Sequence, residues 1–438
     1  MSDQSLKRSV TTMEALSIVV GMIIGSGIFL KPGVVLASAG SPLGSILAWV
    51  AGGVITLASA LSVAEIASVI PKTGGLYVYL EELYGEQWGF LFGWVQTIIS
   101  CPASIAAQTI AFATYAGYFI PLTDMGRQVV AISSLAFVLI MNTIATKCGG
   151  VIQTLATIGK LVPVVAIIGF GLFSGSAPGS EGVPQLISGS GFGAAILGTL
   201  WAYDGWVSVT NMAGELKDPK RQLPRVISLG VVFVILTYVA FNLAIFRTLP
   251  YHQIVGSATS GTDAAIALFG SAGAAFITAG IMVSVFGSLN GYVMTGSRVP
   301  LAMSRRGQLP FAKTLGKVHP KLRTPANALL LESAIAVLYI LSGSFETLTD
   351  LIIFVLWIFF TMGVVGVFIL RKKFPKSKDT YKVPLFPFTP IVGIIGGGYI
   401  LGSTLLSQPV QSFVGIGITL IGLPVFYYLN GRKGRKSR

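Results

Sequence analysis

The sequence carries little charge. Charged residues make up 11% of its 438 residues, whereas hydrophobic residues make up 53%, and the mean hydropathy is +0.78. Soluble globular chains carry about a quarter charged residues. A chain with so few charges lacks the polar surface that water requires, which excludes a purely water-soluble protein.

Cysteine and histidine are also scarce. The two cysteines are Cys101 and Cys148, and both histidines, His252 and His319, fall in predicted loops. Neither a disulfide framework nor a metal-ligand spacing is present, so we expect no metal site and no cofactor. A membrane enzyme would need an intramembrane histidine, a pair of aspartates or a metal cluster, and we therefore predict that the chain is not an enzyme.

Long apolar runs dominate what is there. A helix needs about 20 apolar residues to cross the hydrocarbon core of a bilayer. Twelve runs qualify, at 13–39, 42–69, 88–120, 127–146, 150–174, 190–212, 225–248, 272–300, 326–343, 347–370, 386–405 and 410–430. They predict an all-α membrane protein with twelve transmembrane helices, forming a single integral domain over residues 1–438. The first run is too long for the apolar region of a cleavable signal peptide.

The positive charges are unevenly placed. The net charge is +14, and 26 of the 30 Lys and Arg residues fall in the termini and in alternate loops between the predicted spans. Positive residues gather in cytoplasmic loops. The charge therefore predicts an orientation in the bilayer, with both termini in the cytoplasm, and we do not expect a nucleic-acid partner.

Two predicted spans are interrupted by residues that disfavour helix. The first contains Gly25-Ser26-Gly27 and the sixth contains Asp204-Gly205, five spans later. Interrupted segments at corresponding positions of two repeats indicate the binding site of a transporter. We predict a five-plus-five inverted repeat, with repeat one at about 11–174, repeat two at about 190–371 and two appended helices at about 386–430.

A broken helix offers both kinds of backbone group to a ligand. Free N–H groups around Gly25, Ser26 and Gly27 would suit a carboxylate at the start of the second half-helix. Free carbonyls near Ile23, together with others near Trp201 and Asp204, would suit an ammonium group. The break thus favours an amino acid zwitterion, although a glycine pair can also serve close helix packing alone.

Ionisable residues inside the membrane are candidates for function. Asp204 could cap the second half of span six, contact the substrate or couple transport to protons. Lys160 could hold the first break by donating to its carbonyls, or it could lose its proton when desolvated. We expect Lys31 to extend its amine outward toward water and Arg298 to anchor a helix at the interface.

Four motifs carry a family resemblance: GMIIGSGIF (21–29), AEIASVIPKTGGLYVYL (64–80), WAYDGWVSVTNMAGELKDPKRQLPRVI (201–227) and FGSLNGYVMTGSRVPLAMSRRGQLP (286–310). They resemble the L-amino-acid transporter family of the amino acid–polyamine–organocation superfamily. Within it the chain is similar to the bacterial exchangers of serine and threonine and of alanine, serine and cysteine. The resemblance covers nearly the whole chain, with its motifs in register.

The resemblance implies sodium-independent exchange of neutral L-amino acids. Lys160 falls where this family has a lysine in place of a structural sodium ion, and Ser284 and Ser288 would face that region. Trp201 falls on an aromatic gate. The implied substrate-binding residues are Ile23, Ile24, Gly25, Ser26, Gly27, Ile28, Trp201, Ala202, Asp204 and Gly205.

Three departures from the pattern of the family refine the expectation. The loop from Pro121 to Gln128 lacks the cysteine that links those members to a glycoprotein, so we expect no disulfide-linked heavy subunit. Asp204 replaces a usual glycine and Trp201 a usual phenylalanine, which predicts small substrates: Ala, Ser, Thr and Cys. The alternatives are a proton-coupled symporter using Lys160 or Asp204, and a sensor without transport. In each case we expect a multi-pass protein of a bacterial cell membrane.

Overall fold

The structure, a computed structural model, describes residues 10–72, 74–144, 146–174, 189–320, 322, 324–342, 345–374 and 380–436. Within these residues every regular element is a helix. The only β pairing there is an isolated bridge between Val10 and Leu216. The predicted all-α class is therefore confirmed.

The first half of the chain forms helices of very different lengths. They are α1 (Thr12–Ile23), α2 (Gly27–Ala39), α3 (Pro42–Val69), α4 (Leu76–Tyr84), α5 (Glu86–Val95), the π-helix η1 (Gln96–Ser100), α6 (Cys101–Ala116), α7 (Asp124–Ile144) and α8 (Thr146–Ser174). The sequence specifies several of these boundaries. Thr11 and Glu14 form a capping box that starts α1, and Gly40 ends α2 in the left-handed conformation.

The second half begins with a short helix and ends with long ones. They are α9 (Gly189–Tyr203), α10 (Ser208–Asn211), the 3-10 helix η2 (Ala213–Glu215), α11 (Pro219–Thr248), α12 (Tyr251–Gly256), α13 (Ser260–Gly296), α14 (Arg298–Arg305), α15 (Ala312–Leu315), α16 (Ala326–Ser342), α17 (Phe345–Lys373), α18 (Phe388–Ser407) and α19 (Pro409–Lys436).

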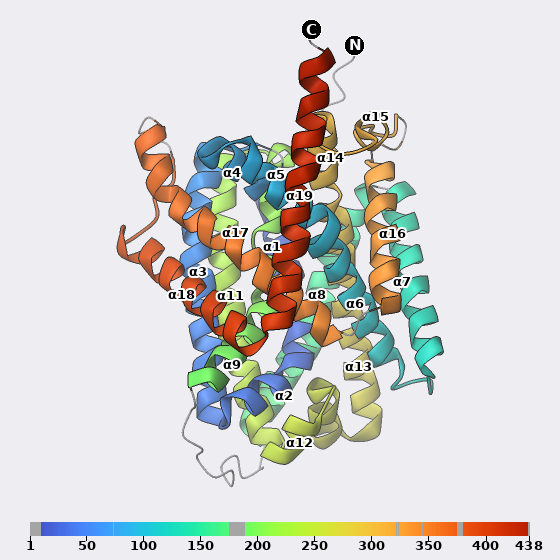
Figure 1. The fold of residues 1–438 in the computed structure, drawn as a ribbon. Helices are drawn as coiled ribbons and strands as arrows, with labels where there is room; N and C mark the ends of the chain where they lie inside the picture. The colour runs from blue at the N-terminus through green and yellow to red at the C-terminus, as the bar shows by residue number, and fades with distance from the viewer. Residues whose placement is uncertain are drawn as a thin grey trace.

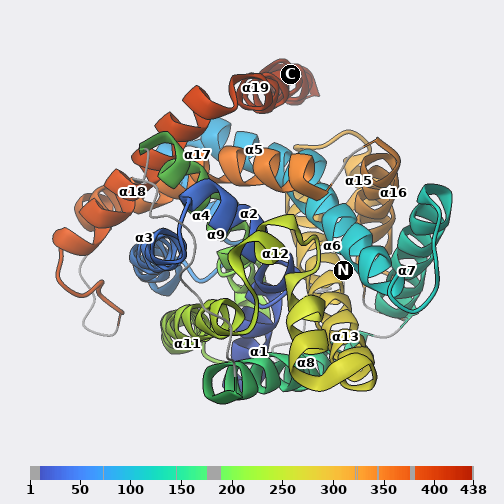
Figure 2. The ribbon, with the colours of Figure 1, turned by 90° about the horizontal axis from the view of Figure 1, so that it is seen from below.

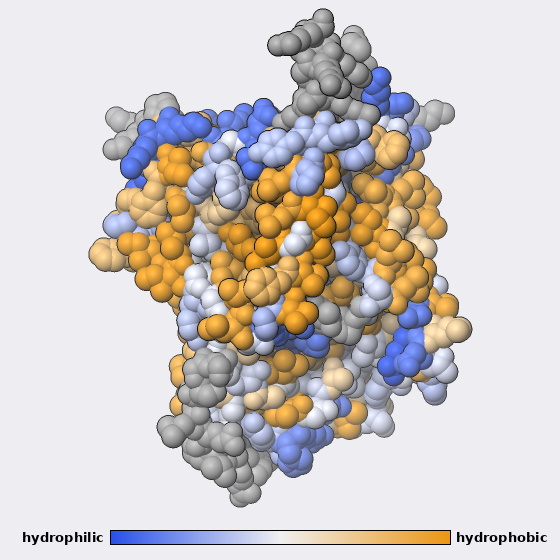
Figure 3. Space-filling view, viewed as in Figure 1, coloured by the Kyte–Doolittle hydropathy of each residue, from blue (hydrophilic) through white to orange (hydrophobic). Residues whose placement is uncertain are grey.

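Ten helical segments of the described chain are long and apolar enough to cross a membrane. Two further apolar helices, Gly191–Tyr203 and Ala326–Ser342, are shorter than 18 residues. Figure 3 shows the matching surface, an apolar band between more polar rims. The chain is thus a multi-pass membrane protein. The number of twelve spans stays a prediction, because two of the twelve apolar helices are too short to qualify by length.

The two interrupted spans cross each other at the centre of the molecule. A methyl group placed on Gly27 would stand 2.6 Å from Ala202 Cα, and one on Gly205 would stand 3.1 Å from Met22 Cβ. The second half of span one therefore lies against the first half of span six, and the two run antiparallel. Figure 2 shows α1, α2 and α9 inside a ring that includes α3, α6, α8, α11, α13 and α17. Antiparallel breaks are what an inverted repeat requires, and the repeat itself stays a prediction.

The two ends of the molecule differ. Both termini lie at the same end, together with α14, α15 and the basic end of α17, while α12 lies at the opposite end (Figure 1). We call these the terminal face and the opposite face. The clustering of basic segments at the terminal face fits the predicted cytoplasmic orientation, which remains a prediction.

Two connections are more ordered than loops. The connection at residues 71–87 contains α4. Its Tyr77 and Tyr79 are fully buried, so α4 packs into the terminal face instead of lying on the bilayer surface. The connection at residues 249–271 contains α12 and the first part of α13, which bends at Gly270 with φ of 67°.

Candidate functional site

The first break lies where the sequence places it. Helix α1 ends at Ile23, residues 24–26 are not helical, and α2 begins at Gly27. All of these residues and Ile28 are buried. The Gly25 amide donates to Ile23 O at 2.8 Å, whereas the amides of Ser26, Gly27 and Ile28 make no backbone hydrogen bond within the described chain. This end of α2 can therefore donate to a carboxylate.

Lys160 occupies the carbonyl side of this break. Its ammonium donates to Gly21 O, to Ile24 O at 2.7 Å and to Ser288 Oγ at 3.2 Å. The side chain is completely buried. An ammonium with several oxygen partners helps to satisfy carbonyls that the break leaves buried, where unpaired polar groups are costly in a membrane. Of the two roles predicted for Lys160, the geometry matches the one that holds the break.

Helix α13 supplies two hydroxyls to the same oxygens. Ser288 Oγ donates to Gly21 O at 2.9 Å, and Ser284 Oγ lies 3.4 Å from Ile24 O. Gly287, between them, allows the close approach, because a methyl group there would stand 2.7 Å from Ala156 Cβ on α8. Spans one, five and eight therefore meet at one polar cluster, as the family resemblance implies.

Tyr238 joins the two breaks, and the sequence analysis missed it. Its hydroxyl lies 2.7 Å from Ile23 O and 2.7 Å from Ala202 O, and can donate to one of them at a time. The side chain is fully buried on α11. The only signal in the sequence is a tyrosine in the middle of an apolar span.

These contacts correct one prediction. The carbonyl of Ile23 was expected to be free for the ammonium of a ligand, but it accepts from the Gly25 amide and faces the Tyr238 hydroxyl. Likewise Trp201 O accepts from the Asp204 amide at 3.1 Å. In this conformation the protein itself satisfies these carbonyls, so an ammonium would have to displace a hydroxyl.

The second break lies between α9 and α10. Gly205 has φ of 104°, a conformation that favours glycine, and it lets the chain turn beside Met22. Asp204 Oδ2 accepts from the Tyr292 hydroxyl at 2.9 Å. Val207, not Asp204, is the N-cap of α10, and it makes no side-chain cap. The hypothesis that Asp204 caps this half-helix is therefore wrong, and the substrate and proton hypotheses remain.

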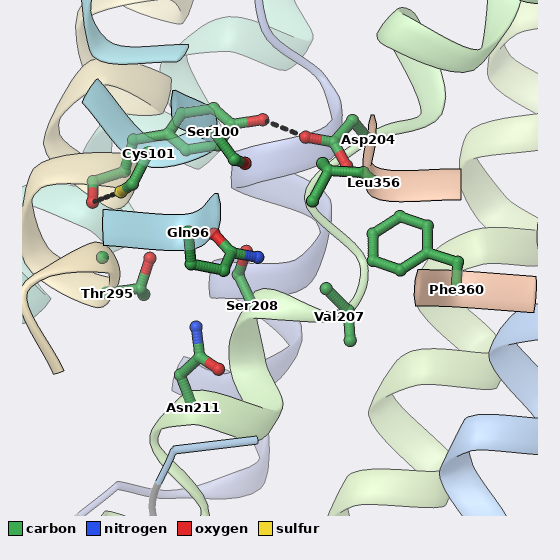
Figure 4. Close-up of a pocket in the computed structure, with 12 residues that line it drawn as sticks. Gln96, Ser100, Cys101, Asp204, Val207, Ser208, Asn211, Thr295, Leu356 and Phe360 are labelled. Atoms are coloured by element: carbon green, nitrogen blue, oxygen red, sulfur yellow. Dashed lines mark hydrogen bonds between the residues drawn. The ribbon is translucent and has the colours of Figure 1, made fainter. Parts of the chain in front are cut away.

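A pocket opens beside the second break, on the side toward α10. Its walls come from η1, α6, α10, α13 and α17 and from the turn after α9, and its lining residues are Gln96, Ser100, Cys101, Asp204, Val207, Ser208, Asn211, Tyr292, Thr295, Gly296, Leu356 and Phe360. Figure 4 shows Asp204 with its bond to the Tyr292 hydroxyl at one end, and Asn211 toward the other. The lining combines amides and hydroxyls with one carboxylate, which suits a polar solute.

The opposite face is closed over Trp201. Trp201 packs edge-on against Phe345 of α17, with ring centroids 5.9 Å apart. Lys31 of α2 pairs with Glu346 and donates to Thr349 Oγ at 3.1 Å, and its ammonium lies 5.3 Å from the Phe345 ring centre. Lys31 is completely buried, so the expectation that it extends to water is wrong. An ion pair on α17 holds it inside the protein.

Gln108 of α6 is a second residue that the sequence analysis missed. A methyl group on Gly25 would stand 3.1 Å from Gln108 Nε2 and 2.9 Å from Ser288 Oγ, so both side chains lie against the break. Among the residues that the structure describes, Gln108 Oε1, Ser104 Oγ and Ser26 Oγ are buried and have no hydrogen-bond partner. A glutamine within an apolar span was a usable signal, because amides are rarely left unpaired in a membrane.

Two other expectations concern single residues. Arg298 is 4% exposed and pairs with Glu215 at 3.3 Å, so it is a buried ion-pair partner and not an interfacial anchor. His252 lies in α12 and not in a loop. Within the residues that the structure describes, no three His, Cys, Asp or Glu side chains come together as metal ligands would.

The structure thus brings the predicted residues into one region. The first break contacts the second through Gly27 and Ala202, and Lys160, Ser284 and Ser288 lie against the carbonyls of the first. Trp201 covers this region from the opposite face, and Asp204 borders the pocket. Such a site, closed on one side and next to a pocket on the other, suits a carrier that exposes its ligand to one side at a time.

Comparisons with known proteins agree with this reading. The family model described as amino acid permease matches residues 10–428. The chain is 45% identical to the serine/threonine exchanger SteT of Bacillus subtilis, with 98% of this chain and 99% of that protein covered.

More distant relatives belong to animals. The chain is 30% identical to the human cystine/glutamate transporter, over 96% of this chain and 85% of that protein. It is also 30% identical to the Asc-type amino acid transporter 1 of Mus musculus, over 97% of this chain and 81% of that protein. The matched families are transporters and not enzymes. The chain therefore belongs to the amino acid permeases of the amino acid–polyamine–organocation superfamily, and within them to the L-amino-acid transporter family.

Proposed function

We propose that the protein exchanges small neutral L-amino acids, such as Ala, Ser, Thr and Cys, across the membrane by alternating access and without sodium. The observation that carries the sodium independence is Lys160. Its ammonium, among Gly21 O, Ile24 O and Ser288 Oγ, lies where oxygen ligands could otherwise bind a cation. A fixed positive charge there removes the need for a bound ion to hold the break.

The substrate site would lie at the two breaks. In this proposal the amides of Ser26, Gly27 and Ile28 bind the substrate carboxylate, because the start of a helix attracts anions. Displacement of the Tyr238 hydroxyl from Ile23 O or Ala202 O would free an acceptor for the ammonium group. Gln108 and Ser26, buried without full pairing, would complete the polar lining.

Trp201 and Asp204 would limit the size of the substrate side chain. Trp201 is held against Phe345, and Asp204 against Tyr292, so neither side chain is free to swing aside without losing a partner. The name of the relative SteT, a serine/threonine exchanger, supports small polar substrates.

We place the protein in the cell membrane with its terminal face in the cytoplasm. The grouping of basic residues at that face supports this orientation. We propose a chain that works without a disulfide-linked subunit, because residues 121–128 contain no cysteine.

Proteoliposomes test the exchange. The purified chain should take up labelled serine when the vesicles contain unlabelled serine or alanine, and not when they are empty. Replacing sodium with choline should leave this uptake unchanged. Competition by the other amino acids should rank alanine, serine, threonine and cysteine above leucine and tryptophan. Equal uptake by empty vesicles would contradict exchange.

Proton-coupled symport is the second candidate, and Asp204 is the observation that favours it. A carboxyl that is 6% exposed and borders a pocket can bind and release a proton as the pocket hydrates. Uptake by empty vesicles under an imposed pH gradient would support this candidate over exchange. Transport in either form would exclude a sensor without transport.

A further inference from the structure

A second buried carboxyl lies outside the site described above. Glu332 is on α16, within the apolar stretch ALLLESAIAVLYIL, and is 1% exposed. Leu330 and Leu338 of the same helix are 54% and 65% exposed, so they mark the outward face of α16. Glu332 therefore points into the protein, at membrane depth.

Its carboxyl group packs between α6 and α13. A methyl group placed on Gly296 would stand 3.0 Å from Glu332 Oε2 and 1.8 Å from Cys101 Sγ. Gly296 thus leaves the space in which the carboxyl and the thiol meet. No N–H or O–H group of the described chain donates to either oxygen of Glu332, and the polar group that meets the carboxyl is the Cys101 thiol, a weak donor. The neighbouring Ser333 Oγ has no hydrogen-bond partner there either.

Few charges face this carboxyl. On the helices packed against α16, the titratable or charged groups that act on it are the Cys101 thiol of α6 and the Arg298 guanidinium of α14. Arg298 is already paired with Glu215, and it also donates to Met294 O and to Ser297 Oγ at 3.3 Å.

The remaining charged groups on these helices point elsewhere. Tyr292 of α13 donates to Asp204. Asp124 and Arg127 of α7, Arg305 of α14 and Lys313 of α15 are exposed, and Asp263 at the far end of α13 accepts from Ser257. Asp204 borders the same pocket as Cys101 and acts on that thiol. Within the described residues, no cation is therefore dedicated to Glu332.

A carboxylate in these surroundings would be a buried charge with no donor stronger than a thiol among the described residues, which is strongly unfavourable. A carboxylic acid of the same shape loses much less on burial, because it carries no net charge. The packing seen here therefore accommodates the protonated side chain. The carboxylate needs water or a new donor, which requires the packing to change.

The neighbours of Glu332 supply such a change. Cys101 and Gly296 both line the pocket of Figure 4, so Glu332 lies directly behind its wall. A small separation of α6 from α13 would bring pocket water to the carboxyl. The O–H bond would then break, with the proton passing to water and the negative charge remaining on Glu332.

We propose that Glu332 is a proton-binding site, occupied when the pocket wall is closed and emptied when the pocket widens. The inference rests on the proposed function only in taking this pocket as part of the substrate path. It predicts that the ligand-free protein exchanges between the closed and the widened pocket wall, and that a substrate which stabilises the closed wall makes the protein take up protons.

Two measurements on the purified full chain in detergent test the site. Infrared difference spectra, recorded with and without L-serine, should contain a protonated-carboxyl band. This band should be lost in Glu332→Gln and kept in Asp204→Asn. Addition of L-serine to weakly buffered protein with an indicator dye should cause proton uptake in the wild type, reduced to background in Glu332→Gln. Ser333→Ala, a buried neighbour on the same helix, is the matched control and should behave as wild type.

Three outcomes would overturn the proposal. The first is a wild-type spectrum without the protonated-carboxyl band, the second is a band that is lost in Asp204→Asn instead, and the third is proton uptake that is unchanged in Glu332→Gln. The wild-type measurement decides the first case even if Glu332→Gln does not fold. Neither readout requires transport, so failure of serine exchange in vesicles would count against the proposed function and not against this site.

Discussion

The two breaks at the centre of the protein are stabilised in different ways. At the first, the carbonyls of Gly21 and Ile24 are satisfied by Lys160 and Ser288, all of them buried away from the pocket. At the second, Asp204 has one side-chain partner, the Tyr292 hydroxyl, and it borders the pocket.

This difference indicates how one fold can combine a rigid element with a movable one. An ammonium with three oxygen partners resists rearrangement, because each lost contact leaves a buried polar group unpaired. A carboxyl with one hydroxyl partner next to a pocket rearranges more readily. We infer that the first break is the more rigid and that the second changes its contacts as the ligand enters or leaves.

Loss of Lys160 should have the largest effect. Lys160→Met leaves the carbonyls of Gly21 and Ile24 buried without this donor, at about 1–3 kcal/mol each, so exchange should fall about a hundredfold. The rate of labelled serine exchange and the temperature of thermal unfolding measure these two losses. Lys317→Met, at an exposed lysine, should match the wild type. A Lys160→Met protein with normal exchange would mean that the first break needs no fixed cation.

Disruption of the contact between the two breaks should have the next largest effect. Gly27→Ala puts a methyl group 2.6 Å from Ala202 Cα, and overpacking of this kind destabilises by about 1–3 kcal/mol. We expect a lower unfolding temperature together with weaker exchange. Gly402→Ala, on α18, where no atom lies within 4 Å of the added methyl, serves as the control. Equal behaviour of both variants would show that the breaks are not closely packed.

Asp204→Asn should separate charge from shape at the second break. Asparagine keeps an acceptor for the Tyr292 hydroxyl but loses the negative charge, so we expect kcat/KM for serine to fall about tenfold, as for the loss of about 1.4 kcal/mol. The unfolding temperature should change little. Asp124→Asn, at a fully exposed carboxylate, controls for charge alone. Wild-type exchange by Asp204→Asn would remove Asp204 from the substrate path.

Lys31→Met should have the smallest effect. It removes the pair with Glu346, whose side chain is 47% exposed, and the contact with the Phe345 ring that covers Trp201. Lys31 is buried, but Glu346 stays half-exposed to water when the amine is removed, so we expect a loss of about 1 kcal/mol and a change in exchange of about fivefold or less. Lys72→Met, in the exposed pair with Glu82, should have no effect. A loss as large as that of Lys160→Met would make the opposite face the rigid part of the carrier.

Much of the fold could be predicted because the bilayer imposes simple rules. Apolar runs must become helices, since backbone groups have no water to bind in the membrane. Glycine and aspartate inside two runs located both breaks, and the observed ends of α1 at Ile23 and of α9 at Tyr203 fall within the expected segments.

Side-chain partners could not be predicted in the same way. Lys31 was expected to reach water because a long lysine side chain can extend out of a span, and Arg298 was expected at the interface because it stands at the end of an apolar run. Their carboxylate partners, Glu346 and Glu215, are 315 and 83 residues away in the sequence. Tyr238 and Gln108 were missed for the same reason, since their importance lies in which helix they face.

The sequence by itself determined that the protein lies in a bilayer, where its helices run and the two places where they break. Hydropathy and backbone propensity act over short stretches of chain, so these features can be read locally. Only the tertiary structure decided which groups satisfy those breaks. That Lys160 and Tyr238 reach the carbonyls, that Asp204 is not a cap and that Glu332 lies behind the pocket wall all depend on packing between distant helices. Pairing of buried polar groups is a property of the assembled fold, since the partner of each is supplied by another helix.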